Sequence, residues 1–146
     1  MKKKSLMIFI TLLFTLVACS SENVESDSPD YIKDSFEYFK SIKSLVSSVN
    51  EGEEVDKAIK SNFENKSEFN DWVDNNYDPG DESSEEALLI SHYQVIKISL
   101  ENLIIFSASK SMGVEGVDTS SPINSIEASL SNLESIYENY GYEPKD

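Results

Sequence analysis

The chain has 146 residues, with 27 Asp and Glu against 12 basic residues, and a formal net charge of −15 at pH 7. Nucleic acids and anionic headgroups are bound through basic side chains, so a surface this acidic excludes both as partners. The chain has no arginine and one histidine, His92, which excludes a guanidinium clamp and a multi-histidine metal site within one chain. With Cys19 as its single cysteine, it cannot form an intramolecular disulfide.

The N-terminal segment is typical of an export signal. Three lysines, Lys2 to Lys4, precede an uncharged and mostly apolar run from Leu6 to Val17. This run is shorter than the roughly 20 residues that a membrane-spanning helix needs. A basic head, a short apolar core and a small residue at the end are the features of a secretory signal. We therefore expect residues 1–18 to be a cleaved signal peptide.

The end of this segment reads Leu16-Val17-Ala18-Cys19. It resembles the lipobox of bacterial lipoproteins, in which an aliphatic residue, a tolerant position and a small residue precede a cysteine. The resemblance covers residues 1 to about 20. It implies that Cys19 receives a diacylglyceryl group and becomes the mature N-terminus. The alternatives from the residue itself are a free buried thiol or an intermolecular disulfide.

A diacylglyceryl group predicts a location as well as a modification. Two acyl chains hold a protein stably on a bilayer, whereas one chain holds it only marginally. The predicted location is therefore the extracytoplasmic face of the cell membrane, with the lipid as anchor. A composition rich in Lys, Asn, Ser and Ile, without arginine, is consistent with a low-GC Gram-positive host.

The mature chain divides into a tether and one domain. Residues 19–28 are polar and acidic, which predicts a disordered tether. Residues 29–146 form the expected domain, beginning with Ser28 as N-cap and Pro29 as the first helical residue. The first helix follows an apolar stripe at three- and four-residue spacing and stops at Gly52. The stripe consists of Ile32, Phe36, Phe39, Ile42, Val46 and Val49.

The segment 53–76 has a weaker helical pattern. Its apolar positions are interrupted near Asn65, which together with Glu68 could cap a fresh helix, so this segment is either one helix or two. Trp72 lies at helical spacing and is expected in the core rather than at a ligand site.

Residues 83–110 form the longest predicted helix. A capping box of Ser83 and Glu86 marks its start, and Gly113 follows its end. Apolar residues cover most of its circumference, and only Gln94, Lys97 and Glu101 make a narrow polar stripe. A helix that is apolar nearly all round is either buried or spans a membrane. Because Lys97 and Glu101 oppose a membrane span, we expect this helix in the middle of the fold.

The last predicted helix begins with Ser121 as cap and Pro122 as its first residue, and it ends at Gly141. Its apolar residues alternate at three and four, the spacing of near-parallel helix packing. These residues are Ile123, Ile126, Leu130, Leu133, Tyr137 and Tyr140. No segment shows the alternation of a strand. The fold class that follows is all-α, a compact bundle of four antiparallel helices, or five if residues 53–76 divide.

The acidic segment from Asp74 to Glu85 resembles a calcium-binding EF-hand loop at four positions: Asp74, Asn76, Asp78 and Glu85. However, Pro79 stands where the family has the glycine of the sharp turn, and Gly80 comes one place late. An acidic interhelical loop with a turn at Asp78-Pro79-Gly80 is the preferred interpretation. Calcium or other cation binding stays as an alternative.

Catalysis is a further alternative, centred on His92. The chain lacks a Gly-x-Ser-x-Gly elbow, a phosphate loop and a dinucleotide fingerprint. No catalytic, cofactor or metal residue is therefore assigned, and His92 is expected to be partly covered by neighbouring helices.

The predicted function is non-catalytic. We expect a lipid-anchored lipoprotein that binds a protein partner, for example as an accessory of an envelope complex or as an immunity or exclusion factor. The sequence identifies neither the partner nor the oligomeric state. This role requires an exposed apolar patch, which we expect on segment 53–76 or in the stretch Met112–Val117.

Overall fold

The computed structural model describes residues 28–80 and 84–142. The predicted signal peptide and Cys19 lie outside these ranges. Over the described ranges the chain forms five helices and no strand. They are α2 (Asp30–Asn50), α3 (Val55–Asn62), α4 (Lys66–Asn76), α5 (Glu85–Ser111) and α6 (Ser120–Asn139).

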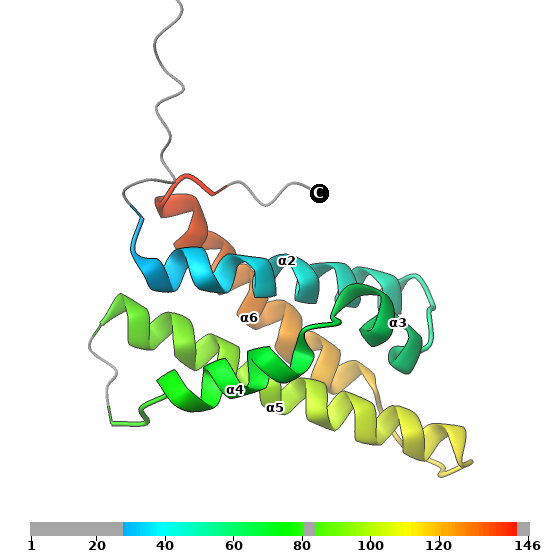
Figure 1. Cartoon of the computed structure of the whole chain (residues 1–146). Helices are drawn as coiled ribbons and strands as arrows, with labels where there is room; N and C mark the ends of the chain where they lie inside the picture. The colour runs from blue at the N-terminus through cyan, green and yellow to red at the C-terminus, as the bar shows by residue number, and fades with distance from the viewer. Residues whose placement is uncertain (1–27, 81–83, 143–146) are drawn as a thin grey trace, which may run out of the picture.

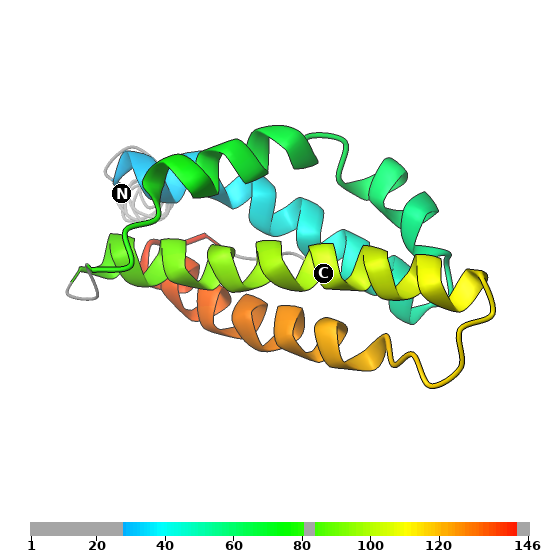
Figure 2. The same ribbon diagram turned by 90° about the horizontal axis from the view of Figure 1, so that it is seen from below.

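The four longer helices run alternately up and down the bundle, and the short α3 occupies the turn between α2 and α4 (Figure 1). α5 packs most extensively against α6 and also contacts α3 and α4, while α2 contacts α3 and α6. Seen from below, α5 lies in front of α2, with α4 along one side and α6 along the other (Figure 2). The predicted all-α bundle is confirmed.

α2 begins one residue later than predicted, because Pro29 occupies the N-cap position and Asp30 is the first helical residue. The fixed φ of proline suits either position, and the Pro29 carbonyl accepts the N–H groups of Ile32 and Lys33. The helix ends as predicted, before Gly52, whose φ of 96° is a conformation that glycine adopts at little cost.

The segment 53–76 divides into two helices, α3 and α4, with the break at residues 63–65. Phe63 ends α3 and is buried, so the chain turns at a point where its side chain enters the core. Asn65 is the N-cap of α4, as predicted, although its side chain makes no capping hydrogen bond. Trp72 packs against Tyr93 and Tyr38, with ring centroids 5.4 and 5.6 Å apart, which confirms its place at the core.

α6 begins at Ser120, one residue before the predicted cap. The side chain that stabilises this start is Asp118, whose Oδ1 accepts the Ser120 N–H at 2.9 Å and the Ser120 hydroxyl at 2.7 Å. These two bonds to the charged form lower the pKa of Asp118. Pro122 therefore lies within the first turn, where its missing N–H leaves no helical hydrogen bond unmade.

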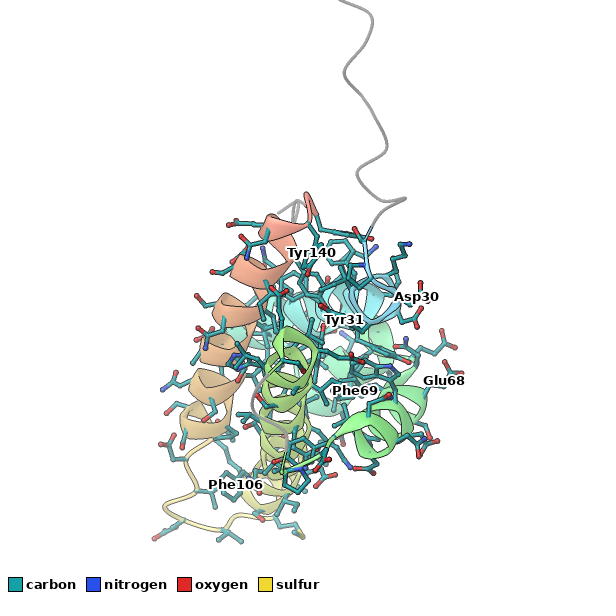
Figure 3. The ribbon with its side chains drawn as sticks, turned by 90° about the vertical axis from the view of Figure 1, so that its left-hand side faces the viewer. Asp30, Tyr31, Glu68, Phe69, Phe106 and Tyr140 are labelled. Carbon is teal, nitrogen blue, oxygen red and sulfur yellow. The ribbon has the colours of Figure 1, made fainter. Side chains whose placement is uncertain are left out.

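All the described helices contribute to one core. The largest fully buried side chains include Phe39 of α2, Phe69 of α4 and Tyr137 of α6. Figure 3 shows how α4 divides between core and solvent: Phe69 points into the bundle, whereas its neighbour Glu68 points out of it. The ring centroids of Phe69 and Tyr93 lie 5.7 Å apart, so aromatic contacts join α4 to α5.

A chain of hydroxyl groups inside this core joins α2, α5 and α6. The Tyr93 hydroxyl donates to the Ser35 carbonyl at 2.8 Å, and the Tyr93 and Tyr137 hydroxyl oxygens lie 2.6 Å apart. The Ser35 hydroxyl lies 2.7 Å from Tyr137 Oη and 2.5 Å from the Tyr31 carbonyl. Each hydroxyl has one proton: Tyr93 donates its proton to the Ser35 carbonyl, and Ser35 donates its proton to the Tyr31 carbonyl. This leaves Tyr137 as the donor toward Tyr93 Oη and Ser35 Oγ. We call Ser35, Tyr93 and Tyr137 the hydroxyl network.

Burial keeps the two phenols of this network protonated. Desolvation raises the pKa of Tyr93 well above its ordinary value and raises the pKa of Tyr137 to about 12. Nearer the surface, the Tyr140 hydroxyl lies 3.4 Å from Tyr31 Oη and donates to Glu85 at 2.6 Å. Figure 3 shows Tyr31 and Tyr140 together at one end of the bundle.

Replacing Tyr93 by phenylalanine tests the hydroxyl network. Tyr93→Phe keeps the ring but leaves the Tyr137 hydroxyl and the Ser35 carbonyl each without one buried partner, so we expect a loss of about 1–3 kcal/mol in the free energy of unfolding. Urea titration followed by circular dichroism measures this loss. The control is Tyr77→Phe, whose ring is partly exposed and whose loss should be about 0.5 kcal/mol or less. Equal losses in the two variants would contradict the role given to the network.

Candidate interaction face

His92, the candidate catalytic residue, lies on α5 with its side chain partly buried. Desolvation lowers its pKa, so the imidazole is neutral at pH 7. Within residues 28–80 and 84–142, no hydrogen bond or ion pair joins it to a carboxylate or to a serine hydroxyl. The structure therefore does not bring a nucleophile or a second acid–base group to His92.

The four candidate calcium ligands are bonded to different partners. Asp74 forms an ion pair with Lys97 of α5, and the Asn76 amide donates to the Trp72 carbonyl at 2.7 Å. Asp78 Oδ1 accepts the Gly80 N–H at 2.8 Å, which is the turn that the sequence predicts. Glu85 accepts the Tyr140 hydroxyl.

Residues 81–83 of this segment lie outside the described ranges. Among the residues that the structure describes, no three His, Cys, Asp or Glu side chains come together in a group that could hold a metal ion.

The cap of α5 is Ser84, whose hydroxyl oxygen accepts the Ala87 N–H at 3.0 Å. The predicted capping box has Ser83 as the cap and Glu86 as its partner, so the observed cap lies one residue later than predicted.

A polar hollow of about 530 Å³ lies where α2 faces the break between α3 and α4. Three carboxylates, those of Glu37, Glu64 and Glu68, line it together with serine and asparagine side chains. The lining has no basic residue to activate a serine and no apolar wall to bind a small organic ligand. This hollow is therefore a solvated acidic surface.

α5 has two apolar sides, and only one of them is used by the fold. The inner side includes Leu89, Tyr93, Leu100 and Leu103, which are buried in the core. The opposite side exposes Ile98 at 48% and Ile105 at 57%. We expect this helix to be buried in the middle of the fold, and α3, α4 and α6 do contact it; the expectation is wrong for its opposite side, which these helices leave in solvent.

The exposed side repeats with the spacing of a coiled-coil seam. Its residues alternate at intervals of three and four from the first turn of α5 to the C-cap. They are Leu88, Ser91, Val95, Ile98, Asn102, Ile105, Ser109 and Met112. We call this set the α5 outer face. None of its members is charged, although 27% of the chain is.

The exposed large apolar side chains occur at one of the two expected locations and extend beyond it along α5. No large apolar side chain of segment 53–76 is among the exposed ones. Met112 and Val114 are exposed at 75% and 52%, so the stretch Met112–Val117 contributes one end of the patch, and Val117 is partly buried. The heptad spacing from Leu88 to Met112 is the sequence signal for this exposed face. The signal is hard to recognise because further apolar residues, which belong to the buried side of α5, lie between its members.

Comparison with known protein families, curated proteins and solved structures found no match. The function must therefore be argued from the residues themselves. No helix within the described ranges has the length and apolar character needed to cross a bilayer. The α5 outer face is thus the strongest candidate site in the described part of the chain.

Truncating one residue on each side of α5 tests whether the fold depends on the inner side and not on the outer face. Leu100→Ala should lower the free energy of unfolding by about 2–5 kcal/mol, because Leu100 is buried and its loss leaves a cavity. Ile98→Ala should cost about 1 kcal/mol or less, since half of its side chain already contacts water. Urea unfolding of the two variants measures both effects. A comparable loss in Ile98→Ala would mean that the outer face supports the fold.

Proposed function

We propose that this chain is a bacterial lipoprotein, anchored through Cys19 at the extracytoplasmic face of the cell membrane, whose helical domain binds a protein without catalysing a reaction. Residues 1–19 support the anchor by their resemblance to a lipoprotein signal. The single observation that supports the binding role is the α5 outer face.

The shape of this face favours a protein over a small molecule. A helix surface is convex, whereas small ligands bind in concave pockets that enclose most of their area. An uncharged apolar stripe along a helix is the kind of surface that a second helix covers, through side chains at i, i+3, i+4 and i+7. The exposed members Leu88, Val95, Ile98 and Ile105 recur at intervals of seven and three residues, which keeps them on one side of the helix.

The net charge of −15 narrows the class of partner. It disfavours nucleic acid and direct adhesion of the domain to anionic lipid, since both require basic side chains. An anchored acidic domain is repelled from an anionic bilayer surface over about 8 Å at physiological salt. The α5 outer face then remains accessible to proteins in the envelope.

The anchor predicts a mass change at one residue. The chain extracted from a bacterial host should lack residues 1–18 and carry a diacylglyceryl group on Cys19, as measured by intact mass spectrometry. Cys19→Ala should keep its leader, because the signal peptidase acts after lipidation. Ser20→Ala, next to the cleavage site, should behave as the unaltered chain. An unmodified thiol with the leader attached would overturn the anchor.

The binding role predicts a crosslink from one side of α5. A photo-reactive amino acid placed at Ile98 in intact cells should give a discrete product of higher mass, because Ile98 lies within the proposed interface. The same amino acid at Ser131, an exposed position on α6, should give none. Absence of product from both Ile98 and Ile105 would overturn the protein-binding role.

A further inference from the structure

α6 carries its charges on one flank. Between Ser120 and Asn139 its acidic residues are Glu127, Glu134 and Glu138, and it has no basic residue. Two of these acids turn toward α2: Glu127 accepts the Asn50 amide at 2.8 Å, and Glu134 lies 3.4 Å from Lys43. The opposite flank therefore turns away from α2.

This opposite flank is uncharged along its whole length. At 100° per residue, positions 121, 125, 128, 132, 135 and 139 lie on one side of the helix, separated from the acids by the buried residues Ser129, Leu133 and Ile136. The residues are Ser121, Ser125, Ala128, Asn132, Ser135 and Asn139, and all but Ser125 are exposed. We call this set the α6 neutral flank.

The α5 outer face and the α6 neutral flank lie on the same side of the molecule. Lys97 pairs with Asp74 of α4, and Glu85 bonds to Tyr140 at the end of α6, so α4 and α6 lie on opposite edges of α5. The outer face is between those edges, on the side away from the core. Figure 2 looks at this side, where α5 lies in front of α2 and α6 runs beside α5.

Four serines on this surface are already hydrogen-bonded within their own helices. Ser91 and Ser109 donate to the carbonyls of Leu88 and Ile105, at 2.7 and 2.8 Å. Ser125 and Ser135 of α6 likewise donate one turn back, to Ser121 and Ser131. A hydroxyl whose proton is bonded internally costs little to remove from water. The surface is therefore easier to bury than its serine content suggests.

The surface is large enough for a stable dimer. The 20 residues of α6 extend about 30 Å at about 1.5 Å per residue, and two packed helices about 10 Å apart form a strip about 20 Å wide. Two such strips in contact would remove about 1,200 Å² from water, the lower bound of a standard specific interface.

We propose that the α5 outer face and the α6 neutral flank together form the contact with a second copy of this chain. The proposal rests on the proposed function, in that it takes the α5 outer face as a binding surface, and it names the partner. In a two-fold arrangement whose axis crosses both helices near their middle, α5 meets α5 of the other copy and α6 meets α6, so the surface covers itself.

The uncharged character of the surface fits a second copy better than the other occupants. Two molecules with a net charge of −15 repel each other, and a contact built from uncharged residues keeps their carboxylates apart. A basic partner helix would need acids along the surface, but between Ala87 and Ser111 α5 has only Glu101. A bilayer surface favours large apolar and basic side chains, whereas the α6 half consists of Ser, Ala and Asn.

Asn102 supports a self-complementary contact. It lies near the middle of α5 and of the heptad stripe, close to where a two-fold axis would cross. Its side-chain amide has both donors and an acceptor, so it can pair with the same residue of another copy. A single asparagine in a coiled-coil seam fixes the register and the oligomeric state.

The test is the molar mass of the full chain, extracted from its host membrane in a non-ionic detergent and measured by light scattering with the detergent subtracted. We expect two copies per particle. Asn132→Glu adds a carboxylate to the contact in each copy and should raise the dissociation constant about tenfold or more. Ser131→Glu adds the same charge next to it on α6, outside the neutral flank, and should leave the mass unchanged.

Two further readouts keep this test independent of folding. Both glutamate variants alter exposed positions and should keep the circular dichroism of the unaltered chain. Raising the salt concentration should strengthen the dimer, because it screens the repulsion between two acidic molecules. In intact cells, Asn102→Cys should form a disulfide-linked dimer under mild oxidation, and Ser131→Cys should not.

One copy per particle at all concentrations, or equal effects of Asn132→Glu and Ser131→Glu, would overturn the second-copy contact. If one copy per particle is found while the photo-reactive group at Ile98 still yields a product with a different protein, the second-copy contact falls and the protein-binding role stands. If there is neither a dimer nor any product, both fall.

Discussion

The hydroxyl network of Ser35, Tyr93 and Tyr137 is the interaction that fixes how α5 sits in the bundle. Apolar contacts are non-directional, and α5 has apolar residues on every side, so packing alone defines its rotation poorly. Tyr93 must turn toward α2 and α6 to reach the Ser35 carbonyl at 2.8 Å and the Tyr137 hydroxyl at 2.6 Å. A buried phenol without these partners would cost about 1–3 kcal/mol, which is enough to select one rotation. That rotation leaves Ile98 and Ile105 in solvent.

Two further features follow from this orientation of α5. The Lys97 side chain lies against α4, where it pairs with Asp74, so a residue of the acidic segment contributes to the contact between α4 and α5. The Glu85 carboxylate lies against the end of α6, where it binds the Tyr140 hydroxyl. The positions that remain between these two edges form the α5 outer face, next to an uncharged flank of α6. The candidate surface is thus defined by the contacts that hold α5 in place.

The sequence alone predicts most of the helices, because their signals are local. Gly52, Gly113 and Gly141 mark helix ends, and the interruption at Asn65 marks the break between α3 and α4. The start of α6 is harder to predict, since Asp118 and a neighbouring serine both suit a cap. The rotation of α5 about its axis could not be predicted, because apolar residues lie on both sides of this helix and do not indicate which side faces the core. That direction comes from Ser35, a polar residue in the core whose partners are 58 and 102 positions away.

The two apolar sides of α5 also have a consequence for how the chain folds. A helix turned by half a revolution would bring Leu88, Val95 and Ile98 into the interior and still bury a similar quantity of hydrocarbon. Two arrangements that bury comparable apolar area have similar free energies, which is a local frustration of the energy landscape. A specific polar contact is needed to lower the free energy of one of them. Tyr93 would lie in solvent in the reversed arrangement, and the Ser35 and Tyr137 groups would lose it as a partner. A side chain buried at the centre of the domain therefore decides which residues the molecule presents at its surface.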